Sequence, residues 1–101
     1  MIISSQHYLD EDTVEAKRAD GDYTVTLSPE FEIDGETVQA VIDGHHSLAA
    51  ANADGVEPTF VVATAQDDDR VLLLETSVDD YLTACWVDTD WYDVATGRGI
   101  F

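Results

Sequence analysis

Apolar and polar positions along the chain alternate in short segments whose periodicity changes several times. Segments rich in apolar and β-branched residues predict strands at 2–4, 23–27, 31–33, 37–42 and 59–64. Helical patterns follow at 12–19, at 44–54 and at 78–84, and Ser77 is the expected N-cap of the third helix. The segment 70–74 is apolar and fits either a strand or the start of a helix.

The clearest local signal is a hairpin over 31–42. Asp34-Gly35 lies between two apolar arms, and this pair suits a type I′ turn, in which both central residues need a positive φ. The second arm is nearly all apolar toward its end. This indicates a strand that is covered on both faces of a sheet.

The following helix is rich in alanine and ends at Gly55, which is expected at the C′ position, with Pro58 as a stop signal. Small side chains allow a helix to lie close to a sheet. We therefore expect the N-terminus of this helix to be held rigidly where the preceding strand ends.

Length and composition indicate one folded domain over residues 1–101. The chain is 45% hydrophobic and 9% aromatic, which is typical of a folded protein. Its apolar runs fall short of the ~20 residues that a membrane span needs, and the first residues do not resemble a signal peptide. A single cysteine, Cys85, cannot form an intrachain disulfide. These features predict a cytoplasmic protein without a membrane partner.

Charge is the most extreme property of the sequence. Twenty-two acidic residues against four basic ones give a net charge of −18, which repels phosphate backbones and predicts no nucleic-acid binding at moderate salt. Two explanations are open: a halophilic-type acidic surface, or a surface that binds a basic partner or imitates DNA. The acids are spread along the chain, which favours the first.

Two further segments carry candidate chemistry. Asp67, Asp68 and Asp69 could ligate Ca²⁺ or Mg²⁺, but they lack the alternation of an EF-hand, so a solvated turn is favoured. Residues 85–94 are rich in large aromatic side chains. We expect these rings to seal an edge of the core or to form a homodimer contact rather than a ligand cage.

The chemistry of the chain concentrates in the turn Asp43-Gly44-His45-His46-Ser47, between the second hairpin arm and the alanine-rich helix. Adjacent histidines on a helix point about 100° apart, so a metal site completed by His7 is disfavoured. Nucleophilic catalysis by Ser47 is also disfavoured, because the glycine pair of a nucleophile elbow is missing.

An anion fits this turn better. The amides of His46, Ser47 and Leu48 can point at a ligand at the helix N-terminus, and Gly44 permits close approach of the backbone. The alternative is that His45 and His46 only cap the helix and pack its first turn.

Residues 41–51 resemble the signature of the ParB/sulfiredoxin-like superfamily, whose members often carry an Asp-Gly-His-His-Arg-type turn followed by small residues. The superfamily includes CTP-using partition proteins, proposed nucleases, ATP-using sulfiredoxins and small-molecule kinases. The resemblance implies a compact α+β domain with a mixed sheet, a β-hairpin and the alanine-rich helix packed on it. It also implies a nucleotide or phosphate bound at the turn.

The departures from this pattern are specific. Ser47 stands where the superfamily has a phosphate-binding arginine, and His45 stands where sulfiredoxins have their reactive cysteine, so peroxiredoxin repair is not expected. The DNA-binding helices of full partition proteins are also missing. The residues carried over as a nucleotide or phosphate site are therefore Asp43, Gly44, His45, His46 and Ser47.

Two functions follow from these residues. The first is a weak or degenerate nucleotide- or phosphate-binding module in which Asp43 fixes a histidine or a cation. Its candidate ligand is a nucleotide with Mg²⁺, and no catalytic residue and no resident metal are predicted. The second is a non-catalytic protein-interaction domain, either a homodimer or an acidic partner of a basic protein. Loss of the arginine favours the second function, and retention of both histidines favours the first.

Overall fold

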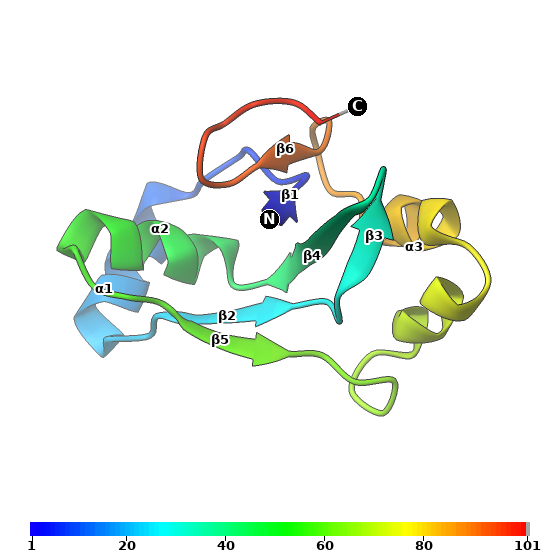
Figure 1. The fold of residues 1–101 in the computed structure, drawn as a ribbon. Coiled ribbons are helices and arrows are strands. Elements are labelled where there is room, and N and C mark those ends of the chain that lie inside the picture. The colour runs from blue at the N-terminus through cyan, green and yellow to red at the C-terminus, as the bar shows by residue number, and fades with distance from the viewer. Residues whose placement is uncertain (101) are drawn as a thin grey trace.

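A mixed sheet of six strands forms the centre of the molecule, in a computed structural model that describes residues 1–100 (Figure 1). The strand order is β5-β2-β4-β1-β6, and β3 pairs with β4. The strands are β1 (Ile2–Ser4), β2 (Thr24–Leu27), β3 (Phe31–Ile33), β4 (Glu36–Asp43), β5 (Thr59–Val62) and β6 (Tyr92–Asp93). Two pairs, β1 with β4 and β2 with β5, are parallel, and the other pairs are antiparallel. The predicted α+β class with a mixed sheet is confirmed.

Three α-helices and one 3₁₀ helix complete the fold: α1 (Glu11–Asp20), α2 (His45–Asp54), η1 (Asp69–Glu75) and α3 (Val78–Cys85). All three predicted α-helices are confirmed, and the ambiguous apolar segment belongs to the 3₁₀ helix. The side chain of Ser77 accepts a hydrogen bond from the amide of Asp80, as expected of an N-cap. Gly55 ends α2 in the left-handed conformation.

The hairpin between β3 and β4 has the predicted turn. Asp34 and Gly35 have φ angles of 50° and 82°, and Ile33 pairs with Glu36 on either side of them. Asp34 is the only non-glycine residue among residues 1–100 with a positive φ. Asparagine and aspartate tolerate this region best after glycine, which explains why this dipeptide makes the turn.

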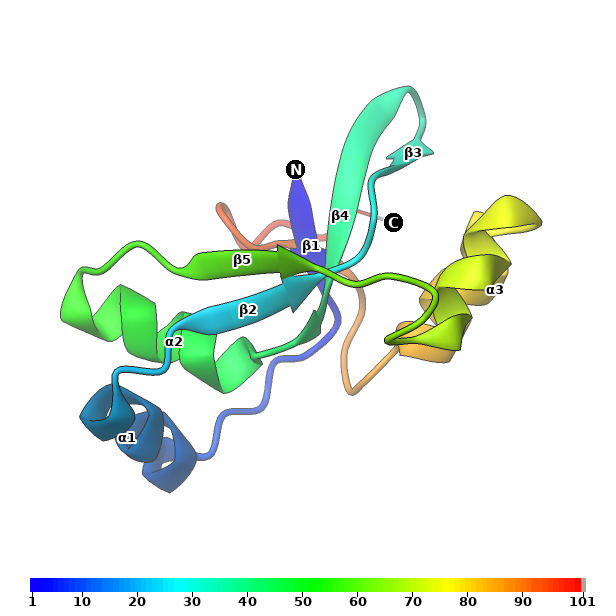
Figure 2. The ribbon, with the colours of Figure 1, turned by 90° about the horizontal axis from the view of Figure 1, so that it is seen from below.

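The central strand β4 is covered on both faces in its second half, as predicted. Val38 and Ala40 belong to a buried cluster with Tyr81 of α3, whereas Val41 belongs to a second cluster with Leu48 of α2. Successive side chains of a strand point to opposite faces. Accordingly, α2 and α3 lie on opposite sides of β4 (Figures 1 and 2).

The aromatic C-terminal segment divides between core and surface. Trp91 is buried in the cluster under α3, so the prediction that these rings seal an edge of the core holds for it. Trp86 is exposed, and the homodimer contact stays a prediction. In the part of the chain that the structure describes, no helix is long and apolar enough to cross a membrane.

Candidate functional site

The predicted strand–turn–helix is present, with Gly44 at the N-cap of α2 and a φ of 91°. A Cβ atom on Gly44 would lie 2.5 Å from the carbonyl oxygen of Thr24 and 2.9 Å from the Cα of Val25. Gly44 also lines a polar cavity, so the expectation that it permits close approach to a ligand stays a prediction. The glycine is needed because the turn packs directly on the backbone of β2.

The first turn of α2 presents a different set of three amides from the one that the sequence suggests. The amide of Leu48 donates to the carbonyl of Gly44 over 2.8 Å, so it is not available to a ligand, contrary to our expectation. The amides of His45, His46 and Ser47 precede the first intrahelical bond and have no acceptor within residues 1–100. These three amides form the positive end of the helix dipole.

A polar cavity of about 370 Å³ lies in front of these amides. It is lined by the five predicted site residues, Asp43, Gly44, His45, His46 and Ser47, and also by Gln6, Lys17, Asp22, Thr24, Thr26 and Ile42. The structure thus brings all predicted residues to one site. The cavity also contains residues that the motif did not indicate: Gln6 shortly after β1, Lys17 of α1, and Thr24 and Thr26 of β2.

Lys17 is the most informative of the added residues. Its Nζ atom lies 3.0 Å from a carboxylate oxygen of Asp22, and both side chains are partly exposed. The hydrogen bond from Lys17 holds the pKa of the Asp22 carboxyl below its usual range, helped by the amide of Thr24, and the same bond raises the pKa of Lys17. A cation therefore stands at the cavity although the arginine of the motif is replaced by Ser47.

Asp43 and His46 have partners other than those expected. One carboxylate oxygen of Asp43 accepts the amide of Gly44 at 2.8 Å, and within residues 1–100 it makes no hydrogen bond to either histidine. The expectation that Asp43 fixes a histidine is therefore wrong. Nε2 of His46 accepts the amide of Asp10 at 3.1 Å, which ties the chain before α1 to the start of α2. His46 thus has a structural role.

His45 lies between this polar cavity and a second, larger one. Its ring is half-buried, and its Nδ1 atom is buried without a hydrogen-bond partner. Burial lowers the pKa of His45. The neighbouring rings of His46 and His7 lower this pKa further, whereas the carboxylate of Asp88 raises it. The imidazole is therefore neutral at pH 7.

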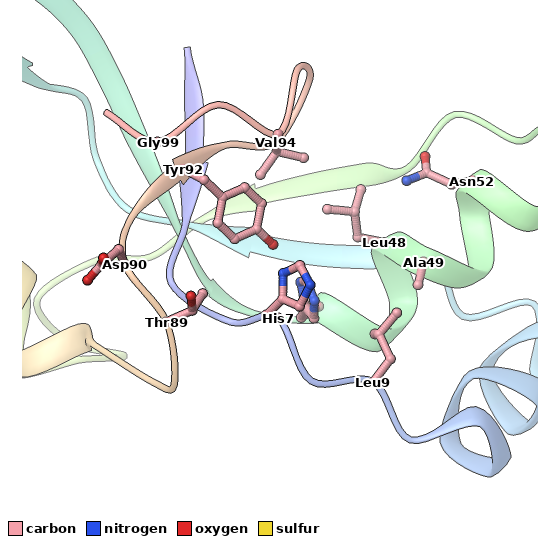
Figure 3. A pocket seen from close by; sticks show the side chains of 12 residues that line it. His7, Leu9, Leu48, Ala49, Asn52, Thr89, Asp90, Tyr92, Val94 and Gly99 are labelled. Atoms are coloured by element: carbon pink, nitrogen blue, oxygen red, sulfur yellow. The ribbon is translucent and has the colours of Figure 1, made fainter. Parts of the chain in front are cut away.

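The second cavity, of about 550 Å³, is lined by His45 and by His7, the third histidine of the chain (Figure 3). His7 packs edge-on against Tyr92 with 6.1 Å between the ring centroids, while Leu48 and Asn52 reach the cavity from α2. The three histidines of the chain thus lie in one region, which the spacing of the sequence did not show. Even so, no group of three or more His, Cys, Asp or Glu side chains within residues 1–100 is placed to hold a metal ion.

The remaining candidates have ordinary structural roles. The guanidinium of Arg70 donates to both carboxylate oxygens of Asp68, and Thr64 donates to Asp67, so the acidic turn is bound by its own neighbours. Cys85, the last residue of α3, is buried, and burial raises the pKa of its thiol. A protonated, buried thiol is unreactive, in keeping with the absence of a sulfiredoxin cysteine at the turn.

Comparison of the chain with protein-family models, with curated proteins and with solved structures gives no match. The likeness of residues 41–51 to the ParB/sulfiredoxin-like turn is therefore carried by that motif alone. Any function must be judged on the geometry of the turn and of the surfaces around it.

Proposed function

We propose that the chain is a nucleotide- or phosphate-binding module of the ParB/sulfiredoxin-like kind, with the phosphate at the N-terminus of α2. The supporting observation is that a single polar cavity is lined by Lys17 and by His45, His46 and Ser47, whose amides have no acceptor within residues 1–100. Helix amides and a fixed cation are the two groups that phosphate binding most often combines.

Lys17 substitutes for the missing arginine in this proposal. Asp22 keeps the amine charged and directed at the cavity, because the carboxylate both raises the pKa of Lys17 and accepts its hydrogen bond. Lysine contacts phosphate as a point charge and lacks the bidentate geometry of arginine. Binding is accordingly weak, in keeping with a degenerate motif.

Asp43 determines which form of the ligand fits. It is an exposed carboxylate beside the amides, so it repels a bare phosphate. Only one of its oxygens is used, by Gly44, and the other can bind Mg²⁺. Magnesium is commonly held by one or two carboxylates together with substrate phosphates. The favoured ligand is therefore a nucleotide with Mg²⁺, and the ion would neutralise charge at the phosphates.

Calorimetry with ATP, CTP, ADP and inorganic phosphate, each with and without Mg²⁺, tests this function. We expect binding that requires Mg²⁺ and that falls about ten- to a hundredfold in Lys17→Gln, since a charged hydrogen bond contributes roughly 1.5–3 kcal/mol. Arg98→Gln is the matched control, because it removes the same charge and does not line the cavity. Failure of all four ligands to bind, or an equal loss in both variants, would contradict the proposal.

A protein-interaction domain is the second candidate. It is favoured by one specific observation: β5 is an edge strand of the sheet, and all four of its residues are exposed. This surface lies on the far edge of β2 from β4 and involves none of the three amides of the phosphate site.

A further inference from the structure

The free edge of β5 is the least protected surface of the fold. Phe60, Val61 and Val62 are 44%, 48% and 48% exposed, and β5 ends the sheet order, so only β2 pairs with it. Figure 1 shows β5 at the lower margin of the sheet, and Figure 2 shows it from the side on which no helix crosses it. Three consecutive large apolar side chains on an edge strand are a template for pairing with another chain.

The backbone of β5 is oriented for such pairing. The amides of Thr59 and Ala63 donate to β2, to the carbonyls of Tyr23 and Leu27, over 2.9 and 2.8 Å. Alternate residues of a strand direct their backbone groups to the same neighbour. The N–H and C=O groups of the even-numbered residues Phe60 and Val62 therefore face outward.

Charge, proline and a bulge, three devices that protect an edge, are missing from this four-residue strand. Its sequence, Thr-Phe-Val-Val, contains no lysine and no proline, and its register with β2 is regular from Thr59 to Val62. Natural proteins normally block exposed edges with charge, proline, a bulge or a covering element. An edge without them indicates a surface that is covered when the protein acts.

The two faces of the edge differ in chemistry. Phe60 and Val62 pair with the buried Val25 and Leu27, so they continue the apolar face. Val61 lies on the opposite face and, with Val62, lines a cavity of about 430 Å³. An added strand would thus meet Phe60 and Val62 on one face, and Val61 beside this cavity on the other.

The cavity on the other face is acidic. Its carboxylates come from Asp43, Asp67 and Asp68, and its single guanidinium, Arg70, is bound to Asp68. Asp43 and Asp67 accept only uncharged donors, namely an amide and a hydroxyl. Asp67, in the loop that follows β5, therefore makes no salt bridge within residues 1–100, whereas Asp43 lies on β4, across β2 from the edge.

We propose that β5 binds an extended, basic segment of another protein by β-strand addition. The partner strand hydrogen-bonds to Phe60 and Val62, its alternate apolar side chains lie beside these two residues, and its lysine or arginine side chains lie on the opposite face, toward Asp67. Main-chain bonds supply affinity in this mode, and alternate side chains supply specificity. This inference deepens the second candidate function and does not depend on the phosphate site.

Charge excludes a second copy as the preferred occupant. Each chain has a net charge of −18, and self-pairing of β5 would bring the same carboxylate, Asp67, to both sides of one interface. Like charges across an interface oppose association, whereas a basic strand is attracted. The structure thus selects a partner of opposite charge.

The test uses the whole chain and a capped synthetic peptide of alternating lysine and valine, monitored by NMR titration at low salt. We expect backbone amide shifts concentrated on β5. Two matched peptides separate the contribution of charge from that of apolar contact. A lysine–serine peptide keeps the positive charge and lacks the apolar side chains, and a glutamate–valine peptide keeps the apolar side chains and reverses the charge. Both should bind at least about tenfold more weakly, because each removes one of the two matched faces.

Val62→Pro is the decisive variant. It removes an outward N–H without disturbing the bonds to β2 or the net charge, and proline is tolerated on edge strands. We expect at least about tenfold weaker peptide binding, whereas Val62→Thr, which keeps the N–H, binds as the wild type does. Thermal melting establishes that both variants are folded, and Mg²⁺-nucleotide titration is expected to give the same result in both as in the wild type.

Three results would overturn the proposal. The first is absence of binding of the lysine–valine peptide to the wild type. The second is equal binding to folded Val62→Pro, which would indicate attraction by overall charge alone. The third is a wild-type dimer in sedimentation that Val62→Pro dissociates, which would make a second copy the occupant.

Discussion

The turn before α2 and the edge strand β5 lie on either side of β2, and they have opposite characters. At the turn Asp43 and His46 hold backbone amides, and Gly44 is pressed against the backbone of β2. At β5 the side chains are apolar, and their outer edge has no neighbour. The turn is built to a single geometry, whereas the edge is open to pairing with another chain.

This difference shows that a recognisable motif and an available surface are separate properties. His46 belongs to the motif, yet its Nε2 atom is used to hold the chain at Asp10. Phe60 belongs to no motif, yet its backbone and side chain are both accessible. The turn before α2 is recognised by its residue types, whereas β5 is recognised only by its position at the edge of the sheet.

The largest expected effect is at the turn. Gly44→Ala puts a Cβ atom 2.5 Å from the carbonyl oxygen of Thr24, at a φ of 91°, so β2 and the turn must separate. We expect a loss of about 3 kcal/mol or more in the free energy of unfolding, measured by denaturant titration. Gly55→Ala is the control, because it has a similar positive φ and open space around it, and it should cost only about 1 kcal/mol. Similar losses in the two variants would mean that the turn is not pressed on β2.

A smaller effect is expected from pH at His45. Burial lowers its pKa in the folded state, while the unfolded value is about 6.5. Below that value the unfolded chain binds the proton more readily, so the stability present at higher pH is lost as pH falls through about 6.5 toward the lowered pKa. Melting temperatures between about pH 7.5 and 5.5 should fall more in the wild type than in His45→Gln. Parallel curves for the two proteins would show that His45 is not buried in its neutral form.

The smallest effect on stability is expected at the edge. Phe60→Thr removes an exposed aromatic ring from β5 and introduces a β-branched residue that suits a strand, so the free energy of unfolding should change by less than about 0.5 kcal/mol. The melting curve of this variant measures the change. A loss of several kcal/mol, comparable with that of Gly44→Ala, would show that Phe60 is part of the core and that the two regions do not differ as described.

Local signals in the sequence determined most of the secondary structure. Asp34-Gly35 specifies its turn because few residues accept positive φ, and Ser77 specifies a helix start because its side chain bonds an amide in the first turn. Each of these signals involves only a few neighbouring residues. The turn at Gly44 was found for the same reason, together with the histidines that follow it.

Only the tertiary structure decided which distant groups share a site. Lys17 reaches the cavity because α1 packs on α2, and His7 joins His45 because the chain after β1 passes the start of α2. The reason for Gly44 lies in β2, and the exposure of β5 follows from its place at the end of the sheet order. Strand order depends on pairings between segments far apart in the chain. No local pattern encodes those pairings, so the hydrophobic run at 59–64 reads alike whether it is central or at an edge.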